Sequence, residues 1–197
     1  MKRYYALLLF ALAATSATAA STTYNVDPDH THPSFEVDHF GGLSTWRGNF
    51  KKSSGTVTLD AEAKTGTVDV VIDTATVDFA HDKLNEHVSS PEVLDVAKYP
   101  TAEYKGRFVE FANGAPKTVA GTLTLHGVSN KLTVPVKITY LKDKLHDRFP
   151  QLQGDLLVLR ATFNIKRGDF GINKGAFEDK VSDDIELTLA LAGQSPR

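Results

Sequence analysis

The chain has 197 residues and no cysteine, with 22 Lys and Arg residues against 24 Asp and Glu residues. The absence of cysteine excludes disulfide bonds, thiolate metal sites and a lipid anchor attached to cysteine. Loss of Lys2 and Arg3 with the segment described next leaves 20 basic and 24 acidic residues, a net charge of −4. This charge argues against a nucleic-acid partner, which favours a basic face, and provides no polybasic patch for anionic lipid.

The N-terminus has the three parts of a secretory signal peptide. Lys2 and Arg3 precede an apolar run at residues 4–14, and small residues follow as far as Ala20. A membrane-spanning helix needs about 20 apolar residues, so this run is short for a retained anchor. We therefore expect export to the periplasm, cleavage after Ala19 or Ala20, and one mature domain over residues 21–197.

Apolar and polar side chains alternate in four short stretches of residues 34–73. In the first, residues 34–40, Phe35, Val37 and His39 share a face, and Gly41 and Gly42 end the stretch. The next three stretches are expected at residues 43–52, 55–60 and 65–73, with a turn at residues 61–64. Such short connections predict antiparallel pairing.

A helical insert is expected between residues 82 and 100. Ser90, Pro91 and Glu92 form the pattern of a helix start: a capping hydroxyl, proline in the first turn and an acid after it. Leu84 and Val88 suggest one helical turn before this start. Strand patterning resumes at residues 102–111, and a turn follows at residues 113–114.

Residues 121–140 give the clearest strand pattern in the chain, a hairpin with one apolar and one polar face. A turn is expected at residues 126–130, which include Gly127, Ser129 and Asn130. Pro135 lacks an N–H group and predicts an edge position or a bulge in the second strand. The apolar face of the hairpin is expected to contain Leu123, Leu125, Leu132, Val134, Val136, Ile138 and Tyr140.

The C-terminal third predicts two more strands around a charged loop. A polar loop at residues 142–154 precedes a strand at 156–167, residues 169–184 form the glycine-bearing loop, and residues 185–191 form the closing strand. This gives eight or nine strands. Several are longer than the usual five or six residues, and closing them into a barrel removes exposed edges. We therefore expect a mainly β fold, an elongated antiparallel eight-stranded barrel with a short helical insert; a packed sandwich is the alternative.

Several short motifs, in this order along the chain, resemble those of the YceI-like polyisoprenoid-binding family. They are Asp27-Pro28-Asp29-His30, the Phe35-Val37-His39 alternation, residues 44–50 with Arg47-Gly48, residues 87–100 with Ala97-Lys98-Tyr99-Pro100, residues 121–128 with Gly121, Leu123-Thr124-Leu125 and Gly127-Val128, and Arg167 with Asp169-Phe170-Gly171. The resemblance covers nearly all of the mature chain. It implies a lipocalin-like barrel whose apolar tunnel holds a long isoprenoid or related lipid.

The chain departs from the family pattern at the helical insert. Leu84 and Asn85 stand where a basic–acidic pair commonly precedes His87, and Val93 and Leu94 stand where two aromatic residues often occur. These departures bear on the contacts to the lipid head group and on the shape of the tunnel end.

The alternation and the resemblance together give a set of candidate ligand-binding residues. About ten buried methylene groups contribute ~8 kcal/mol before ordering costs, which corresponds to micromolar binding. A lumen long enough for a prenyl tail is therefore expected to supply the affinity, although any single apolar side chain of this kind is more often plain core. The candidates are Phe35, Val37, His39, Arg47, Val57, Leu59, Val68, Val70, Ile72, Leu94, Leu123, Leu125, Leu132, Val134, Val136, Phe163, Ile165, Leu187 and Leu189.

Polar residues raise two further hypotheses. Arg47 and Arg167 suit a phosphate or quinone oxygen, because guanidinium binds phosphate with two parallel bonds, but surface ion pairs explain them equally well. His30 and His32, with Asp27 and Asp29, have the donor types of a zinc site but lack a visible third and fourth ligand. No G-x-S-x-G nucleophile motif and no phosphate-binding loop is present.

The predicted function is therefore a non-enzymatic periplasmic carrier for an isoprenoid-type lipid such as a polyprenyl phosphate or a quinone. No catalytic residue, metal or cofactor is assigned. A transient contact with a membrane or a membrane protein is left open. The oligomeric state is also left open, and a dimer is one of the options. Two rivals remain: an enzyme that modifies a lipid with histidines at the barrel mouth, and a stress-related structural protein with a filled core.

Overall fold

The computed structural model describes residues 21–197, so the expected signal peptide at residues 1–20 lies outside the described residues. The strands are β1 (Thr22–Val26), β2 (Ser34–His39), β3 (Ser44–Phe50), β4 (Ser53–Asp60), β5 (Thr65–Asp73), β6 (Val77–Asp78), β7 (Thr101–Ala112), β8 (Ala115–Leu125), β9 (Val128–Pro135), β10 (Lys137–Leu141), β11 (Gly154–Lys166) and β12 (Val181–Pro196). The helices are α1 (Asp82–Ser89) and the 3₁₀ turns η1 (Pro28–His30), η2 (Thr74–Thr76), η3 (Leu145–Asp147) and η4 (Arg167–Phe170). No helix in this part of the chain has the length and apolarity needed to span a membrane.

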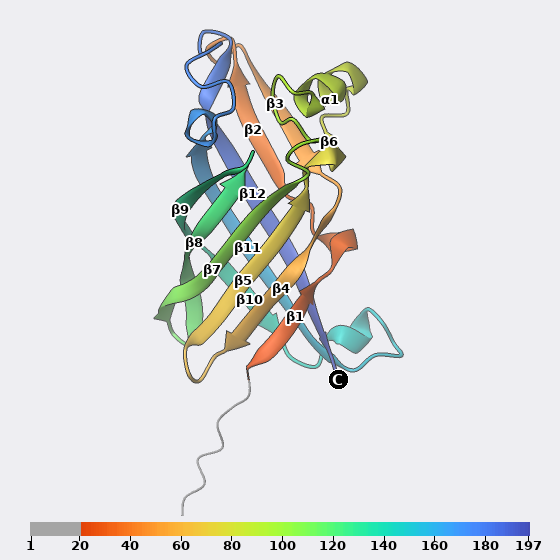
Figure 1. The fold of residues 1–197 in the computed structure, drawn as a ribbon. Coiled ribbons are helices and arrows are strands. Elements are labelled where there is room, and N and C mark those ends of the chain that lie inside the picture. The colour runs from red at the N-terminus through yellow and green to blue at the C-terminus, as the bar shows by residue number, and fades with distance from the viewer. Residues whose placement is uncertain (1–20) are drawn as a thin grey trace, which may run out of the picture.

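These twelve segments form eight rows of one antiparallel sheet, because four pairs of consecutive segments continue the same row. β1 and β2 both pair with β12. On their other side, β3 pairs with β2 and β4 pairs with β1. In the next row, β5 pairs with β4 and β6 pairs with β3. The rows wrap into the elongated barrel of Figure 1, which confirms the predicted fold class.

The fourth interrupted row, β9 with β10, is where the sheet comes round on itself. β9 pairs with β8, and β10 pairs with β11. Only Val136 separates the two segments, and its N–H donates to the carbonyl of Lys117 at 2.7 Å. Pro135, the last residue of β9, cannot donate a hydrogen bond, and the row changes partner directly after it. The predicted irregularity at Pro135 is confirmed. No strand pairing joins β9 to the facing part of β11, so the hydrogen-bond ladder is discontinuous there.

The closing strand is much longer than predicted. β12 has 16 residues and pairs with β11 along its length and with β2 and β1 on its other side. Gly193, Gln194 and Ser195 carry no apolar pattern, yet they remain in the strand because neighbours on both sides pair with this region. Sequence patterning also missed β1, a five-residue strand that closes the row against β4 and β12.

Two local predictions were wrong. The hairpin turn contains only His126 and Gly127, with φ of 51° and 74°, so Ser129 and Asn130 belong to β9. Positive φ at both residues is the requirement of the tight type I′ hairpin turn.

The helix lies before Ser90 rather than after it. His81 is the N-cap of α1, and its ring accepts the N–H of Leu84 at 3.2 Å. Ser90 is the C-cap, and its hydroxyl donates to the carbonyl of His87 at 2.7 Å. Residues 90–99 therefore form turns, with Asp95 at a positive φ of 45°.

Buried aliphatic side chains fill the barrel toward the end that carries β1, β10 and the C-terminus, which lies at the bottom of Figure 1. Leu145, Leu157, Leu191 and Val57 have no exposed surface there, and Tyr24 is 2% exposed. A pocket of about 380 Å³ remains at the rim of this end, between β1, β10 and the β4–β5 and β7–β8 turns. Two polar clusters cover this end. One is Asp155 with Tyr140 and Arg197, and the other is Asp27 with Arg148 and Gln194.

Candidate functional site

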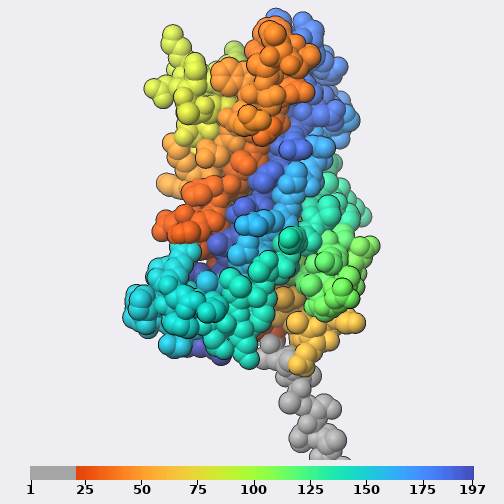
Figure 2. All heavy atoms as spheres, turned by 180° about the vertical axis from the view of Figure 1, so that it is seen from behind, coloured from red at the N-terminus to blue at the C-terminus, as the bar shows by residue number. Residues whose placement is uncertain are grey.

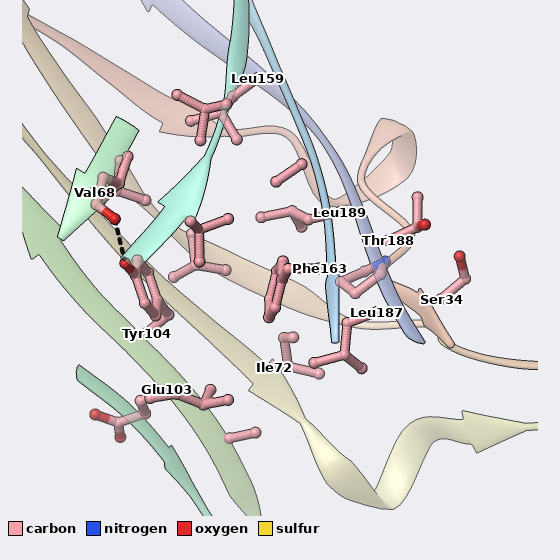
Figure 3. Close-up of a pocket in the computed structure, with 18 of the residues that line it drawn as sticks. Ser34, Val68, Ile72, Glu103, Tyr104, Leu159, Phe163, Leu187, Thr188 and Leu189 are labelled. Atoms are coloured by element: carbon pink, nitrogen blue, oxygen red, sulfur yellow. Dashed lines mark hydrogen bonds between the residues drawn. The ribbon is translucent and has the colours of Figure 1, made fainter. Parts of the chain in front are cut away.

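An apolar cavity lies in the middle of the barrel. Its volume is about 100 Å³, and its walls come mainly from β5, β7, β8, β11 and β12, with single residues from β2, β3 and β9. Figure 3 shows Ile72, Tyr104, Phe163, Leu187 and Leu189 around the same space. The expected lumen, one long space empty of side chains, is not present as a continuous space in this conformation, because packed side chains separate this cavity from the spaces at the two ends of the barrel.

The main polar group of this cavity, the phenol of Tyr104, is already bonded. Its hydroxyl lies 3.1 Å from the carbonyl oxygen of Val119 and 3.2 Å from that of Leu132. Burial raises the pKa of Tyr104 to about 12, so the phenol stays neutral and remains a donor. The cavity thus offers an almost wholly apolar surface, and Glu103, the acidic residue among its lining, pairs with Lys105 at 3.1 Å.

A second, larger cavity lies at the opposite end from the C-terminus, between α1, β2, β3 and the loop before β12. Its volume is about 630 Å³, within the usual range for small-molecule sites. We call it the mouth cavity. Its walls include Trp46, Phe79, Leu84, Ile172 and Phe177, together with the polar residues His39, His87, Glu92, Arg167 and Lys180.

Phe35 lies between the two cavities. Its ring packs against Phe50, a wall residue of the inner cavity, at 5.5 Å, and against Phe79, a wall residue of the mouth cavity, at 5.3 Å. Gly48 on the paired strand makes room for the ring, because a Cβ there would lie 2.5 Å from Phe35 Cζ. Phe35 pairs with Leu187 of β12, which packs against the apolar cluster around Ile165 and Phe170. We call Phe35 and this cluster the partition.

Many of the predicted ligand-binding residues do gather around the cavities. Those that line the inner cavity are Val68, Val70, Ile72, Leu123, Val134, Val136, Phe163, Leu187 and Leu189. Val37 and His39 line the mouth cavity. The remaining apolar candidates pack in the two core clusters without lining either cavity; they are Val57, Leu59, Leu94, Leu125, Leu132 and Ile165.

Arg47 lies on the outer face of the barrel. Its Nε donates to Glu36 Oε1 at 2.6 Å, and its side chain is 71% exposed. The hydrogen bond that Arg47 donates to the Glu36 carboxylate raises the pKa of Arg47. Arg47 lines neither cavity. It forms a surface ion pair with Glu36 across the β2–β3 pairing.

Arg167 is buried at the mouth, with 6% of its surface exposed. A guanidinium has five N–H groups, and each of them finds a backbone carbonyl here. The acceptors are the carbonyls of Ser182, Ile172, Asn173, Ala176 and Val181, at 2.6–3.2 Å. Arg167 therefore holds the loop between η4 and β12 in place and has no N–H left for a ligand.

The histidines lie apart from one another in pairs with local partners. At the mouth, His39 Nδ1 is 3.4 Å from the Ser44 hydroxyl, and His87 Nδ1 is 3.7 Å from Glu92. At the filled end, His30 lies against Asp27 and the guanidinium of Arg148. Residues 21–197 contain no group of three or more histidine or acidic side chains that could hold a metal ion.

Sequence reasoning missed several wall residues. Leu159 and Ala161 were in phase with Phe163, so alternation carried a signal for them, as it did for Ala102 beside Tyr104. Trp46, Phe79 and Phe177 carried none, because pairing of β3 with β2 and β6 and the Arg167 loop bring them to the mouth.

The comparisons with known proteins agree with this architecture. The YceI-like domain model matches residues 24–192. The chain belongs to the YceI-like family. A UPF0312 protein of Yersinia enterocolitica is 31% identical over 195 residues, which cover 98% of this chain and 96% of that protein. A UPF0312 protein of Yersinia pestis matches with the same identity and coverage.

Solved structures share the YceI-like fold. BcnA of Burkholderia cenocepacia superposes with a TM-score of 0.70 at 23% identity, covering 85% of this chain and 98% of BcnA. A polyisoprenoid-binding domain of Saccharophagus degradans gives a TM-score of 0.69 at 17% identity, with coverage of 89% and 99%. The Campylobacter jejuni YceI protein gives 0.65 at 23% identity, with coverage of 79% and 88%.

Proposed function

We propose that this protein is a periplasmic carrier that binds an isoprenoid-type lipid, with the tail in the barrel and the head group at the mouth. The observation that carries the proposal is the arrangement of an apolar inner cavity behind a larger aromatic mouth cavity, in a barrel filled at its other end. The Saccharophagus degradans neighbour, described as a polyisoprenoid-binding domain, supports this choice of ligand class. The N-terminal sequence pattern supports the periplasmic location.

The cavity volumes support a particular route of entry for such a tail. An engineered apolar cavity of about 150 Å³ holds one benzene molecule. The inner cavity, at about 100 Å³, is smaller, so a tail of several prenyl units must displace the partition at Phe35. The mouth cavity of about 630 Å³ accepts the first part of the ligand without rearrangement. Binding then joins the two cavities as the ring of Phe35 leaves its place between Phe50 and Phe79.

Lys180, His39, His87 and Glu92 provide the head-group contacts at the mouth. Arg167 supplies positive charge but no donor, because all its N–H groups are bonded to carbonyls. A quinone, alcohol or monophosphate head group needs only a few hydrogen-bond donors and is compatible with this mouth. A pyrophosphate needs more donors than these side chains supply, so it fits less well.

Gentle purification of the mature protein from its own host, followed by native mass spectrometry and organic extraction, tests the proposal. We expect a stoichiometric lipid with an isoprenoid tail. Protein that carries no lipid and also fails to bind added quinone and geranylgeraniol would overturn it.

A matched pair of variants localises the tail. Ala161 lines the inner cavity and is 6% exposed, whereas Ala190 faces outward from β12. Ala161→Leu fills much of the cavity and should weaken geranylgeraniol binding roughly tenfold, since each lost methylene contact is worth about 0.8 kcal/mol. Ala190→Leu adds the same atoms outside and should leave binding unchanged. Equal affinities for the two variants would place the tail elsewhere.

The enzyme alternative rests on one observation, that His39 and His87 line the same mouth. It predicts a change in the lipid, whereas a carrier returns its ligand unaltered. Incubating the protein with its extracted lipid and comparing the lipid mass before and after separates the two functions.

A further inference from the structure

The mouth of the barrel has an exposed apolar lip. Phe40, Leu43 and Phe177 are 50%, 82% and 56% exposed. They come from two loops, the β2–β3 turn and the loop between η4 and β12. Figure 1 places both loops at the end opposite the C-terminus, and Figure 2 shows their atoms side by side at the top of the molecule. We call Phe40, Leu43 and Phe177 the lip.

Backbone hydrogen bonds hold the two loops together. The N–H of Phe40 donates to the carbonyl of Lys180 at 2.7 Å, and the N–H of Lys180 donates to the carbonyl of Phe177 at 2.8 Å. His39 and Val181 pair directly below them. The lip is therefore one surface held by the barrel, although its residues come from distant parts of the sequence.

The charge of the lip is balanced. Residues 40–43 contain no ionisable side chain, and the second loop carries Lys174 and Lys180 against Glu178 and Asp179, all exposed. A surface of this kind matches an electrically neutral, zwitterionic lipid surface and lacks the basic cluster that anionic lipid attracts. It is also too small for a second copy of the chain, because a stable dimer buries about 800 Å² on each partner.

We propose that the lip docks the barrel mouth on a zwitterionic phospholipid bilayer, with Phe40, Leu43 and Phe177 inserted among the head groups. This inference rests on the proposed lipid-carrier function. Phe177 and Lys180 also line the mouth cavity, so a docked barrel opens toward the membrane and its ligand crosses no water. Insertion of three partly exposed side chains is weaker than that of a myristoyl chain, which is itself reversible, so the carrier can leave after loading.

Vesicles of pure phosphatidylcholine provide the test, with Trp46 as an internal probe. Trp46 is the only tryptophan of the chain and lines the mouth cavity. We expect the mature protein to co-sediment weakly with these vesicles, and brominated phosphatidylcholine to quench Trp46. The variant Leu43→Ser with Phe177→Ser should reduce the partition coefficient roughly tenfold, because interfacial binding scales with buried apolar area.

The control variant is Val109→Ser with Leu141→Ser, which removes two other exposed apolar side chains, 44% and 38% exposed. It should bind vesicles like the unaltered protein. Equal losses in the two variants, binding that requires phosphatidylglycerol, or no quenching of Trp46 would overturn the docking proposal. Geranylgeraniol binding without vesicles separates the two ideas: if it persists while docking fails, only the docking proposal is wrong.

Discussion

The two ends of the barrel are built from the same alternating strands but are completed in opposite ways. At the C-terminal end, aliphatic side chains without exposed surface fill the interior, and polar clusters around Asp155 and Asp27 tie the chain ends together. At the mouth, aromatic rings stand around a cavity of about 630 Å³, and short helical turns cover it. The difference suggests that stability is concentrated at one end, which leaves the other free to rearrange around a ligand.

Truncating one leucine at each end should expose this asymmetry most strongly. Leu157 is 0% exposed at the filled end, whereas Leu84 is partly exposed on α1 at the mouth. Leu157→Ala should lower the free energy of unfolding by about 3 kcal/mol, because it leaves a cavity that close packing cannot refill. Leu84→Ala should cost about 1 kcal/mol. Urea unfolding measures both, and equal losses would show that stability is spread evenly along the barrel.

Removing the partition residue should produce the next largest effect. Phe35→Ala should cost about 2 kcal/mol, since the ring is only partly buried, and should join the two cavities. An apolar probe such as N-phenyl-1-naphthylamine should then bind several times more tightly. Phe111→Ala removes another partly buried ring, one that packs against Phe108 and not between the two cavities, so it should cost similar stability without raising probe affinity. Improved binding in both variants would mean that general loosening, rather than the partition, controls access.

The polar cluster at the filled end should make that end sensitive to acid. Burial raises the pKa of Asp155, but donation from the N–H of Asp143, from the Tyr140 hydroxyl and from Arg197 outweighs it, so the pKa lies below the ordinary value. A lowered folded-state pKa gives stability that is present above the unfolded value of about 3.9 and is lost as the pH falls through the folded value.

Asp155→Asn should therefore cost about 1.5 kcal/mol at pH 6. The gap between the variant and the unaltered protein should narrow toward pH 3. Urea titrations at several pH values measure the gap, and a constant difference would show that the charge of Asp155 is not what stabilises this end.

Sequence periodicity predicted the parts of the molecule that depend on local alternation. The bounds of β5 match the prediction, and Val68, Val70 and Ile72 do line the inner cavity. The eight-row barrel also follows, because strand number depends on counting turns and alternating stretches.

Periodicity did not predict how the space inside the barrel is divided. Alternation assigns a side chain to the inner face but says nothing of the space it fills, so it could not show that Phe35, seated over Gly48, stands between the two cavities. Likewise an arginine at position 167 suits an anion site when judged from the sequence. Only the folded loop shows that its five N–H groups are all bonded to backbone carbonyls. Both features depend on residues brought together from distant strands and loops.

The smallest effect on overall stability is expected at the tether of the mouth helix. Asp78 accepts hydrogen bonds from Lys51 at 2.8 Å, from the Asn85 side chain of α1 at 2.9 Å, and from the N–H of Ala80 at 3.0 Å. These bonds, that of Lys51 foremost, lower its pKa to about 2, so the tether is present above the unfolded value of about 3.9 and is lost only as the pH falls through about 2.

Asp78→Ala should release α1 at neutral pH without moving the urea midpoint, because little of the filled end depends on this contact. Hydrogen exchange should quicken at residues 79–90 and remain unchanged in β11 and β12, since local opening draws on contacts near the opened segment. Glu86→Ala removes an exposed acid from the same helix and should change neither. If exchange in β11 also quickened, the mouth and the filled end would unfold as one unit, and a freely rearranging mouth would no longer explain how a tail passes Phe35.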